Sequence, residues 1–306
     1  MRYAFSRNPW NGRRLVLFLG LIGLFVFQGL ALARGDTSSD RHFLWSMEAN
    51  GNTYYFLGSL HVMKRDVYPL AAEIEKAYRD CERIVLETNP ESLLDPGLQQ
   101  KFLSAGLLPE GRTLKQTVSP TTYDLFRGKL DELGLTVTLF ERFRPWFCAV
   151  NLAVLAYQKL GFDSSYGIDL HFFQRAKRDG KELIYLEPPE YQIDLFNELG
   201  RLQPDATLRR TLEEIDLLEE LAPRMLQAWL TGDEEGLDVL IKKSFDDFPE
   251  MYDRLFTQRN KRWGSRIERL AREKGNALVI VGAGHLTGDQ SVFDFLRPSG
   301  YRIIQE

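Results

Sequence analysis

Residues 54–61 have the sequence YYFLGSLH, and residues 277–285 have the sequence ALVIVGAGH. Each stretch is a short apolar run followed by the pattern Gly-x-x-His. Runs of this length that are rich in aromatic and β-branched residues and end at glycine predict buried β-strands. A glycine there lets the backbone turn sharply or lets a ligand approach closely. The two stretches therefore predict two core strands, each followed by a histidine.

These histidines, His61 and His285, are two of the four in the chain. Proteins built on α/β sheets place their chemistry just past the carboxyl ends of the strands. We therefore expect the two imidazoles to share one site.

The rest of the chain predicts further strands and several helices. Asn50-Gly51 between two apolar runs is a strong β-hairpin signal. Residues 83–87 and 182–187 are apolar strands that each end in a glutamate, and residues 301–304 predict a last strand. Helical patterns cover residues 120–134, 145–160, 168–179, 188–200, 207–230 and 249–274, with others starting at Pro69 and Asp233 and near Asp294. The predicted fold class is α/β (mixed α+β), a central mixed sheet flanked by helices with a helical insertion.

Composition is that of a globular protein, with 44% hydrophobic and 27% charged residues among 306. The net charge of −4 argues against nucleic acid as the main partner. Because no low-complexity linker interrupts residues 42–306, we expect them to form one domain.

The first 33 residues have the pattern of a secretory signal peptide. Arg13 and Arg14 precede an apolar run over residues 15–33, which ends in a small-residue cleavage pattern at residues 31–33. Residues 34–41 would then be a polar tail of an exported protein, periplasmic or secreted. The alternative is an uncleaved membrane anchor, because the run is close to the ~20 residues that span a bilayer.

Two cysteines, Cys81 and Cys148, fall on apolar faces of predicted helices. An exported protein meets an oxidising compartment, which favours a disulfide. Free, buried thiols are the alternative.

Glu87 is the last residue of the predicted strand at residues 83–87, so it lies at the end of an apolar strand, as the two histidines do. Two imidazoles and a carboxylate form a plausible divalent-metal site that leaves coordination positions open for water and substrate. We therefore predict His61, Glu87 and His285 as metal ligands, with Glu87 also a catalytic candidate. The alternative is that each histidine is hydrogen-bonded in a turn and that Glu87 forms an ion pair.

Glu187 is a second carboxylate at a strand end. It is predicted as a catalytic residue, either a fourth ligand or a general base. The alternative is a charge at the N-terminus of the following helix.

Other polar residues lie on apolar helical stripes, where a buried polar group needs a partner. Arg259 and Asn260 are catalytic candidates on this ground, and Gln192 is a substrate-binding candidate. Their alternative is an ordinary buried hydrogen bond or a snorkelling arginine. Asp169, next to Gly167 at a helix start, caps the helix or binds substrate.

Several common motifs are absent from the sequence: His-Glu-x-x-His, Gly-x-Ser-x-Gly, the P-loop and the dinucleotide fingerprint. The familiar zinc proteases, α/β-hydrolases and nucleotide enzymes are thereby disfavoured.

An ordered set of short motifs resembles the TraB/GumN family, which includes the Tiki proteins. The matching residues span nearly the whole chain after residue 42: residues 56–62, 84–87, 145–146, 166–169, 186–187, 259–260 and 281–286, with Gln192 and Trp263. One departure is Asn89, where the pattern Glu-x-Asp is expected.

The resemblance implies a mixed sheet flanked by helices, with both Gly-x-x-His motifs and a glutamate at one site. It also implies metal-dependent peptide cleavage with manganese or cobalt, and zinc also suits these ligands. The sequence-based hypothesis is therefore an exported metal-dependent hydrolase, a metallopeptidase with a peptide or protein substrate. The alternative is a non-catalytic protein of the same fold that binds or sequesters a peptide, haem or metal. The oligomeric state is left open.

Overall fold

A computed structural model describes residues 41–306. Six strands form one mixed sheet in the order β4-β3-β5-β2-β1-β6. Their bounds are β1 Leu44–Ala49, β2 Asn52–Ser59, β3 Arg83–Leu86, β4 Glu182–Tyr185, β5 Ala277–Gly282 and β6 Ile303–Gln305. The helices are α1 Ala72–Asp80, α2 Pro96–Gly106, α3 Leu114–Thr117, α4 Pro120–Glu132, α5 Pro145–Lys159, α6 Ile168–Asp179, α7 Pro189–Leu202, α8 Pro204–Leu230, α9 Glu234–Ser244, α10 Pro249–Tyr252, α11 Gln258–Leu270 and α12 Val292–Leu296. The predicted fold class is confirmed.

The two strands that carry the Gly-x-x-His motifs are direct neighbours in the sheet. β5 pairs in parallel with β2 on one side and with β3 on the other, and β4 extends the parallel part beyond β3. Every residue of β5 is buried, as expected for a central parallel strand. The four parallel strands therefore bring their carboxyl ends to one edge of the sheet.

The predicted hairpin joins β1 to β2 in antiparallel register. Its turn residues, Asn50 and Gly51, both have positive φ, at 52° and 77°. Asn and Gly tolerate this conformation, which the tightest hairpin turns require. β6 completes the sheet by pairing with β1.

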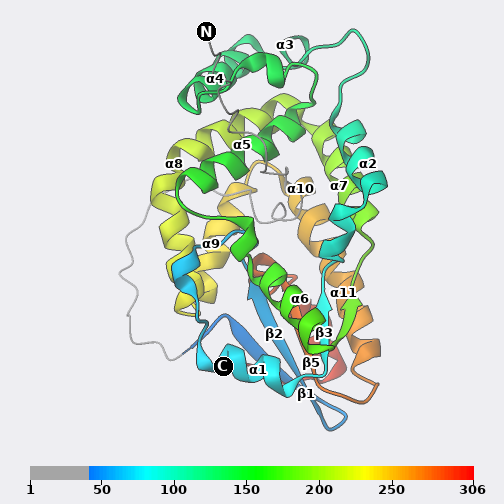
Figure 1. Cartoon of the computed structure of the whole chain (residues 1–306). Helices are drawn as coiled ribbons and strands as arrows, with labels where there is room; N and C mark the ends of the chain where they lie inside the picture. Colours follow the sequence, from blue (N-terminus) through cyan, green and yellow to red (C-terminus); the bar gives the residue numbers. More distant parts are fainter. Residues whose placement is uncertain (1–40) are drawn as a thin grey trace, which may run out of the picture.

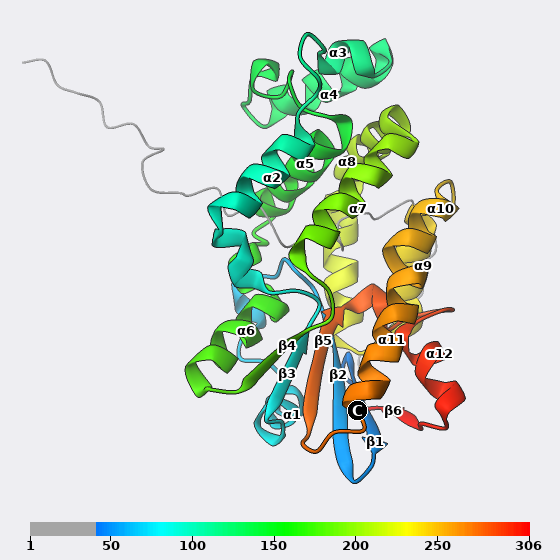
Figure 2. The ribbon, with the colours of Figure 1, turned by 90° about the vertical axis from the view of Figure 1, so that its right-hand side faces the viewer.

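Helices cover both faces of the sheet, with α1 and α6 on one side and α11 and α12 on the other (Figure 2). A largely helical part lies beyond the edge at which the parallel strands end, and α3 and α4 are farthest from the sheet (Figure 1). This outer part has its own apolar cluster, in which Phe126 and Leu130 of α4 pack with residues of α5 and α8. The expected helical insertion therefore forms a layer of helices beyond the carboxyl ends of the parallel strands.

Several local expectations are corrected or decided. The helix expected to begin at Pro69 begins at Ala72, after a cis Tyr68–Pro69 bond and a short extended segment. The single helix expected over residues 249–274 is interrupted by a π-helical turn at Asp253–Thr257. Both cysteines are free and buried, so no disulfide joins them.

The predicted signal peptide, residues 1–33, and the tail up to residue 40 lie outside the described residues. Within residues 41–306, no helix is long and apolar enough to cross a membrane.

Candidate functional site

The strand ends bring the predicted ligands around Gly282, the last residue of β5. A methyl group placed on Gly282 would lie 3.3 Å from Glu87 Oε1, 3.4 Å from His61 Nε2 and 3.5 Å from His285 Cδ2. The Gly282 N–H also donates to Glu87 Oε1 at 2.7 Å. The glycine therefore leaves a small space that two imidazoles and one carboxylate border.

Arg259 of α11 is the cation of this site and is fully buried. Its Nη2 donates to Glu87 Oε2 and to Glu187 Oε1, both at 2.7 Å, and its Nε donates to Glu187 Oε2 at 3.2 Å. Burial opposes its charge, but the two glutamates outweigh burial and raise the pKa of Arg259. The guanidinium thus lies between two carboxylates that would otherwise repel each other in a buried space, and it offsets one of their two negative charges.

Glu187 uses both oxygens to hold Arg259 in place. Besides the guanidinium, Gln192 Nε2 donates to Glu187 Oε1 at 3.0 Å, and Trp263 Nε1 donates to Glu187 Oε2 at 3.2 Å. Each oxygen therefore accepts two hydrogen bonds, which leaves the carboxylate little capacity to bind a metal ion as well. In this structure Glu187 positions Arg259, with Gln192 beside it.

His285 is held as a neutral ring whose Nε2 lone pair faces Arg259. Its Nδ1 lies 2.6 Å from Asn260 Oδ1, and Asn260 Nδ2 donates to the Gln290 carbonyl at 2.8 Å. Because this fixes the amide oxygen as the acceptor, Nδ1 carries the proton, and Nε2 accepts from Arg259 Nη1 at 3.0 Å. Burial, followed by the charge of Arg259, lowers the pKa of His285 well below its ordinary value.

His61 has a different environment. Its Nδ1 lies 3.3 Å from Asp169 Oδ1, a close contact without the alignment of a hydrogen bond. Burial alone would lower its pKa, but the charge of Asp169 outweighs burial and raises the pKa of His61. Asp169 also accepts from Ser59 Oγ at 3.0 Å. Asp169 therefore lies beside His61, and the position of its helix cap is occupied by Gly167.

His61 Nε2 is buried and has no hydrogen-bond partner among residues 41–306. Such an orphaned buried nitrogen is costly unless a ligand, ion or water satisfies it. It borders the space above Gly282, so the orphaned atom belongs to the shared site.

The donor types fit a divalent transition metal, since imidazole and carboxylate are its common ligands. Within the described residues, however, no group of three or more His, Cys, Asp or Glu side chains converges closely enough to hold an ion. Two of the predicted ligand atoms, His285 Nε2 and Glu87 Oε2, are instead hydrogen-bonded to Arg259. A metal bound by all three predicted ligands would have to replace Arg259 at these two atoms.

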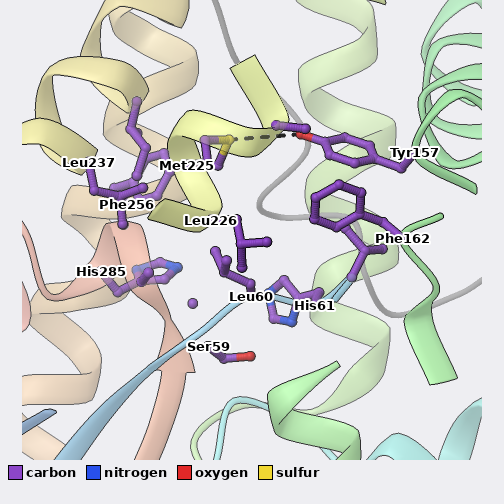
Figure 3. Close-up of a pocket in the computed structure, with 16 residues that line it drawn as sticks. Ser59, Leu60, His61, Tyr157, Phe162, Met225, Leu226, Leu237, Phe256 and His285 are labelled. Carbon is purple, nitrogen blue, oxygen red and sulfur yellow. Dashed lines mark hydrogen bonds between the residues drawn. The ribbon is translucent and has the colours of Figure 1, made fainter. Parts of the chain in front are cut away.

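Two hollows meet at His61. The larger one lies between the strand ends and the helices above them, with His61 and His285 at its floor (Figure 3). The smaller, polar one is bordered by Glu87, Thr88, Asp169 and Gln192. Thr88 Oγ1 is another buried atom without a partner in the described chain.

All the predicted site residues except Asp169 and His61 are joined in one hydrogen-bonded network, and those two contact each other at its border. Sequence reasoning did not assign roles to Ser59, Thr88, Trp263 and Gly282. Trp263 was recognisable as an indole one turn after Arg259, and Thr88 as the neighbour of Glu87. The π-helical turn just before α11 could not be seen in the sequence, and such turns are frequent at functional sites.

Comparisons with known proteins identify relatives over most of this chain. The chain is 28% identical over 263 residues to YbaP of Escherichia coli strain K12, an uncharacterized protein, covering 84% of this chain and 94% of that protein. It is 24% identical to the Metalloprotease TIKI1 of Danio rerio and 23% identical to that of Homo sapiens. Each of these two alignments covers 85% of this chain but only 62% and 61% of the relative. No solved structure matches the chain significantly.

The family profile of the TraB/PrgY/gumN family matches residues 43–305, which is nearly the whole described chain. The resemblance inferred from the ordered motifs is therefore confirmed. This chain belongs to the TraB/PrgY/gumN family.

Proposed function

We propose that this protein is a metal-dependent hydrolase that cleaves peptide bonds. The observation that carries the proposal is the buried, unpartnered Nε2 of His61, which borders the same small space as Glu87 and His285. The distant similarity to proteins named metalloproteases supports the same reading.

His61, His285 and Glu87 would hold the ion, and a divalent ion bound there supplies a polarised carbonyl and a water of lowered pKa. Manganese and cobalt are the proposed ions, and zinc suits the same ligands. Asn260 orients the His285 ring through Nδ1, and the carboxylate of Asp169, 3.3 Å from Nδ1 of His61, would take the same role for that ring. This leaves His61 Nε2 for the shared site, and His285 Nε2 would join it once the ion replaces Arg259 Nη1 there.

Arg259 has two roles in this proposal. In the structure described here its guanidinium balances Glu87 and Glu187. During hydrolysis the same buried cation would stabilise the negative charge that develops on the carbonyl oxygen of the peptide. Gln192, Trp263 and Glu187 would keep it oriented for this role.

Glu87 has two candidate roles, as the third ligand and as the acceptor of the proton that the attacking water loses. The variant Glu87→Gln separates them, because glutamine keeps a neutral oxygen donor but cannot accept the proton. If Glu87 is the proton acceptor, the variant binds metal within about tenfold of wild type while turnover falls ~10²–10⁴-fold. If it is a ligand, metal affinity falls with turnover.

The cleavage test screens a mixed peptide library with the purified protein and manganese, cobalt or zinc, and it detects new peptide termini by mass spectrometry. We expect cleavage with at least one ion and none with chelator or with the His61→Ala, His285→Ala variant. The variant His42→Ala is a matched control, since His42 lies outside the site and pairs with Glu73. Absence of cleavage with every ion, or equal cleavage by the double variant, contradicts the proposal.

A second candidate is peptide capture without turnover. It is favoured by the engagement of Arg259 with His285 and Glu87, which leaves no converged metal site among residues 41–306. Under this candidate, peptide binding survives in the His61→Ala, His285→Ala variant and in chelator, and no peptide is cleaved.

Export is part of the proposal, since the basic and apolar pattern of residues 1–33 is that of a signal peptide. The proposed partners are peptides or proteins outside the cytoplasm, and nucleic acid is not among them. Sequencing the N-terminus of the protein recovered from the producing cell tests this: a mature chain beginning near residue 34 is expected.

A further inference from the structure

The larger hollow above His61 and His285 has an apolar wall built from separate elements of the fold (Figure 3). Tyr157 comes from α5 and Phe162 from the loop after it, and Met225 and Leu226 come from α8. The far wall consists of Leu237 and Ile241 of α9 and Phe256 of the π-helical turn. The space between the walls and the floor, counted together with the solvent at its open mouth, is about 700 Å³.

Apart from the hydroxyl of Tyr157, the polar side chains that line this cleft lie at its floor. Among the described residues that line the cleft, none is an Asp, Glu, Lys or Arg. The hydroxyl of Tyr157 is directed to Met225 Sδ at 3.9 Å, so it is engaged within the wall. A charged or strongly polar group entering the cleft would lose water without gaining a partner, at a large cost in free energy.

The apolar wall is in direct contact with the imidazole ring of His285. The rings of Phe256 and His285 have centroids 5.0 Å apart. The chain after β5 is also packed tightly against the same wall, because a methyl group on Gly284 would lie 2.9 Å from both Ile241 Cδ1 and Phe256 Cε1. A group bound against this wall is therefore adjacent to the shared site.

We propose that the cleft binds a large apolar side chain of the peptide substrate, such as leucine, isoleucine, methionine or phenylalanine, at a residue flanking the cleaved bond. This inference rests on the proposed function for the cleavage step, but the binding preference itself can be measured without turnover. A peptide is favoured over a free apolar molecule because the polar floor, with the orphaned His61 Nε2, suits the backbone of a chain whose side chain enters the wall.

The test measures equilibrium binding in chelator by fluorescence anisotropy. Three fluorescein-labelled octapeptides are compared, with leucine, alanine or aspartate at their four central positions and otherwise identical sequences. An apolar pocket discriminates among side chains that differ by a methylene group by ~10–200-fold. We therefore expect the leucine peptide to bind at least about tenfold more tightly than the alanine peptide, and the aspartate peptide to bind weakest.

Leu226 gives the most direct variants, because it lines the cleft and is only half-buried, whereas its neighbour Met225 is buried. Leu226→Asp places a carboxylate in the cleft and should reduce the preference for leucine to less than about threefold. Leu226→Phe adds volume without charge and should weaken the leucine peptide more than the alanine peptide. The matched control is Leu230→Asp, an exposed position of α8 outside the cleft, which should leave the preference unchanged.

The cleft proposal is overturned if wild type binds the three peptides equally, or if both Leu226 variants retain the preference while their thermal unfolding matches that of wild type. Failure of the proposed function looks different: the leucine preference persists, and no ion supports cleavage. Conversely, cleavage without any apolar preference near the cut bond sustains the hydrolase and removes the cleft proposal.

Discussion

The replacement Arg259→Met tests whether the guanidinium is the cation that the site requires. It keeps an unbranched apolar side chain of similar reach and removes the positive charge. Arg259 is fully buried and is the shared partner of Glu87 and Glu187, so the variant leaves two buried carboxylates without their cation. Removing one partner of a buried ion pair destabilises a protein by ~3–5 kcal/mol.

For a domain of this size, 1 kcal/mol corresponds to about 2–4 °C in Tm. We therefore expect Arg259→Met to lower Tm by roughly 6–20 °C in metal-free buffer, measured by circular dichroism and checked by urea unfolding. The control is Arg272→Met, because Arg272 is highly exposed and forms a surface ion pair with Glu268, an interaction worth at most about 1 kcal/mol.

A compensating variant identifies the cause of the loss. Adding Glu87→Gln and Glu187→Gln to Arg259→Met removes the uncompensated charges, so this triple variant should recover at least half of the lost stability. If Arg259→Met is no less stable than Arg272→Met, or if the triple variant is less stable than the single one, the charge-balance account of the site is wrong.

Three further predictions concern Gly282, His285 and Gly128. Gly282→Ala should fold normally, because Gly282 has a negative φ. The added methyl group would fill the space beside Glu87 and His61. We therefore expect metal affinity, measured by calorimetry, and turnover, measured by the peptide assay, each to fall at least about tenfold. His285 stays neutral in the folded protein, whereas in the unfolded chain its ring takes up a proton below pH ~6.5. The free energy of unfolding of the metal-free protein should therefore fall by up to about 2 kcal/mol as pH drops from 7 to 5, and the fall should be smaller in His285→Gln. Equal pH slopes of the two proteins in urea unfolding would contradict this. Gly128→Ala in α4, where a methyl group meets nothing within 4 Å, should stabilise the protein by ~0.5–1 kcal/mol in the same urea assay. Metal affinity should be unchanged. A loss of stability would contradict the open surroundings of Gly128.

Much of the fold could be predicted because local signals and the global fold agree. Asn50-Gly51 specified the hairpin, and the apolar run at residues 277–282 specified a fully buried strand. The sequence predicts a helix that begins at Pro69, but Pro69 lies in an extended segment that ends at Ala71, and α1 begins at Ala72. Proline is compatible with both settings, so the residue alone does not decide between them.

The sequence predicts which candidate residues lie close together, but not how they are hydrogen-bonded to one another. Histidines and glutamates at strand ends converge because parallel strands end at one edge, which the pattern alone indicates. Arg259 lies between Glu87, Glu187 and His285, just after a π-helical turn that the sequence does not predict. No local sequence signal specifies such a turn, and the contacts of Arg259 with both glutamates are between residues more than 70 positions apart.

The most direct test of the central claim is the metal affinity of the purified protein. Calorimetric titration with manganese, cobalt and zinc is compared between wild type, the His61→Ala, His285→Ala variant and the His42→Ala control. The account predicts one tight site in wild type and in the control, and its loss in a double variant that still unfolds cooperatively. Equal affinity in all three proteins, or no binding in any, would contradict it and leave the two histidines as parts of a metal-free binding site.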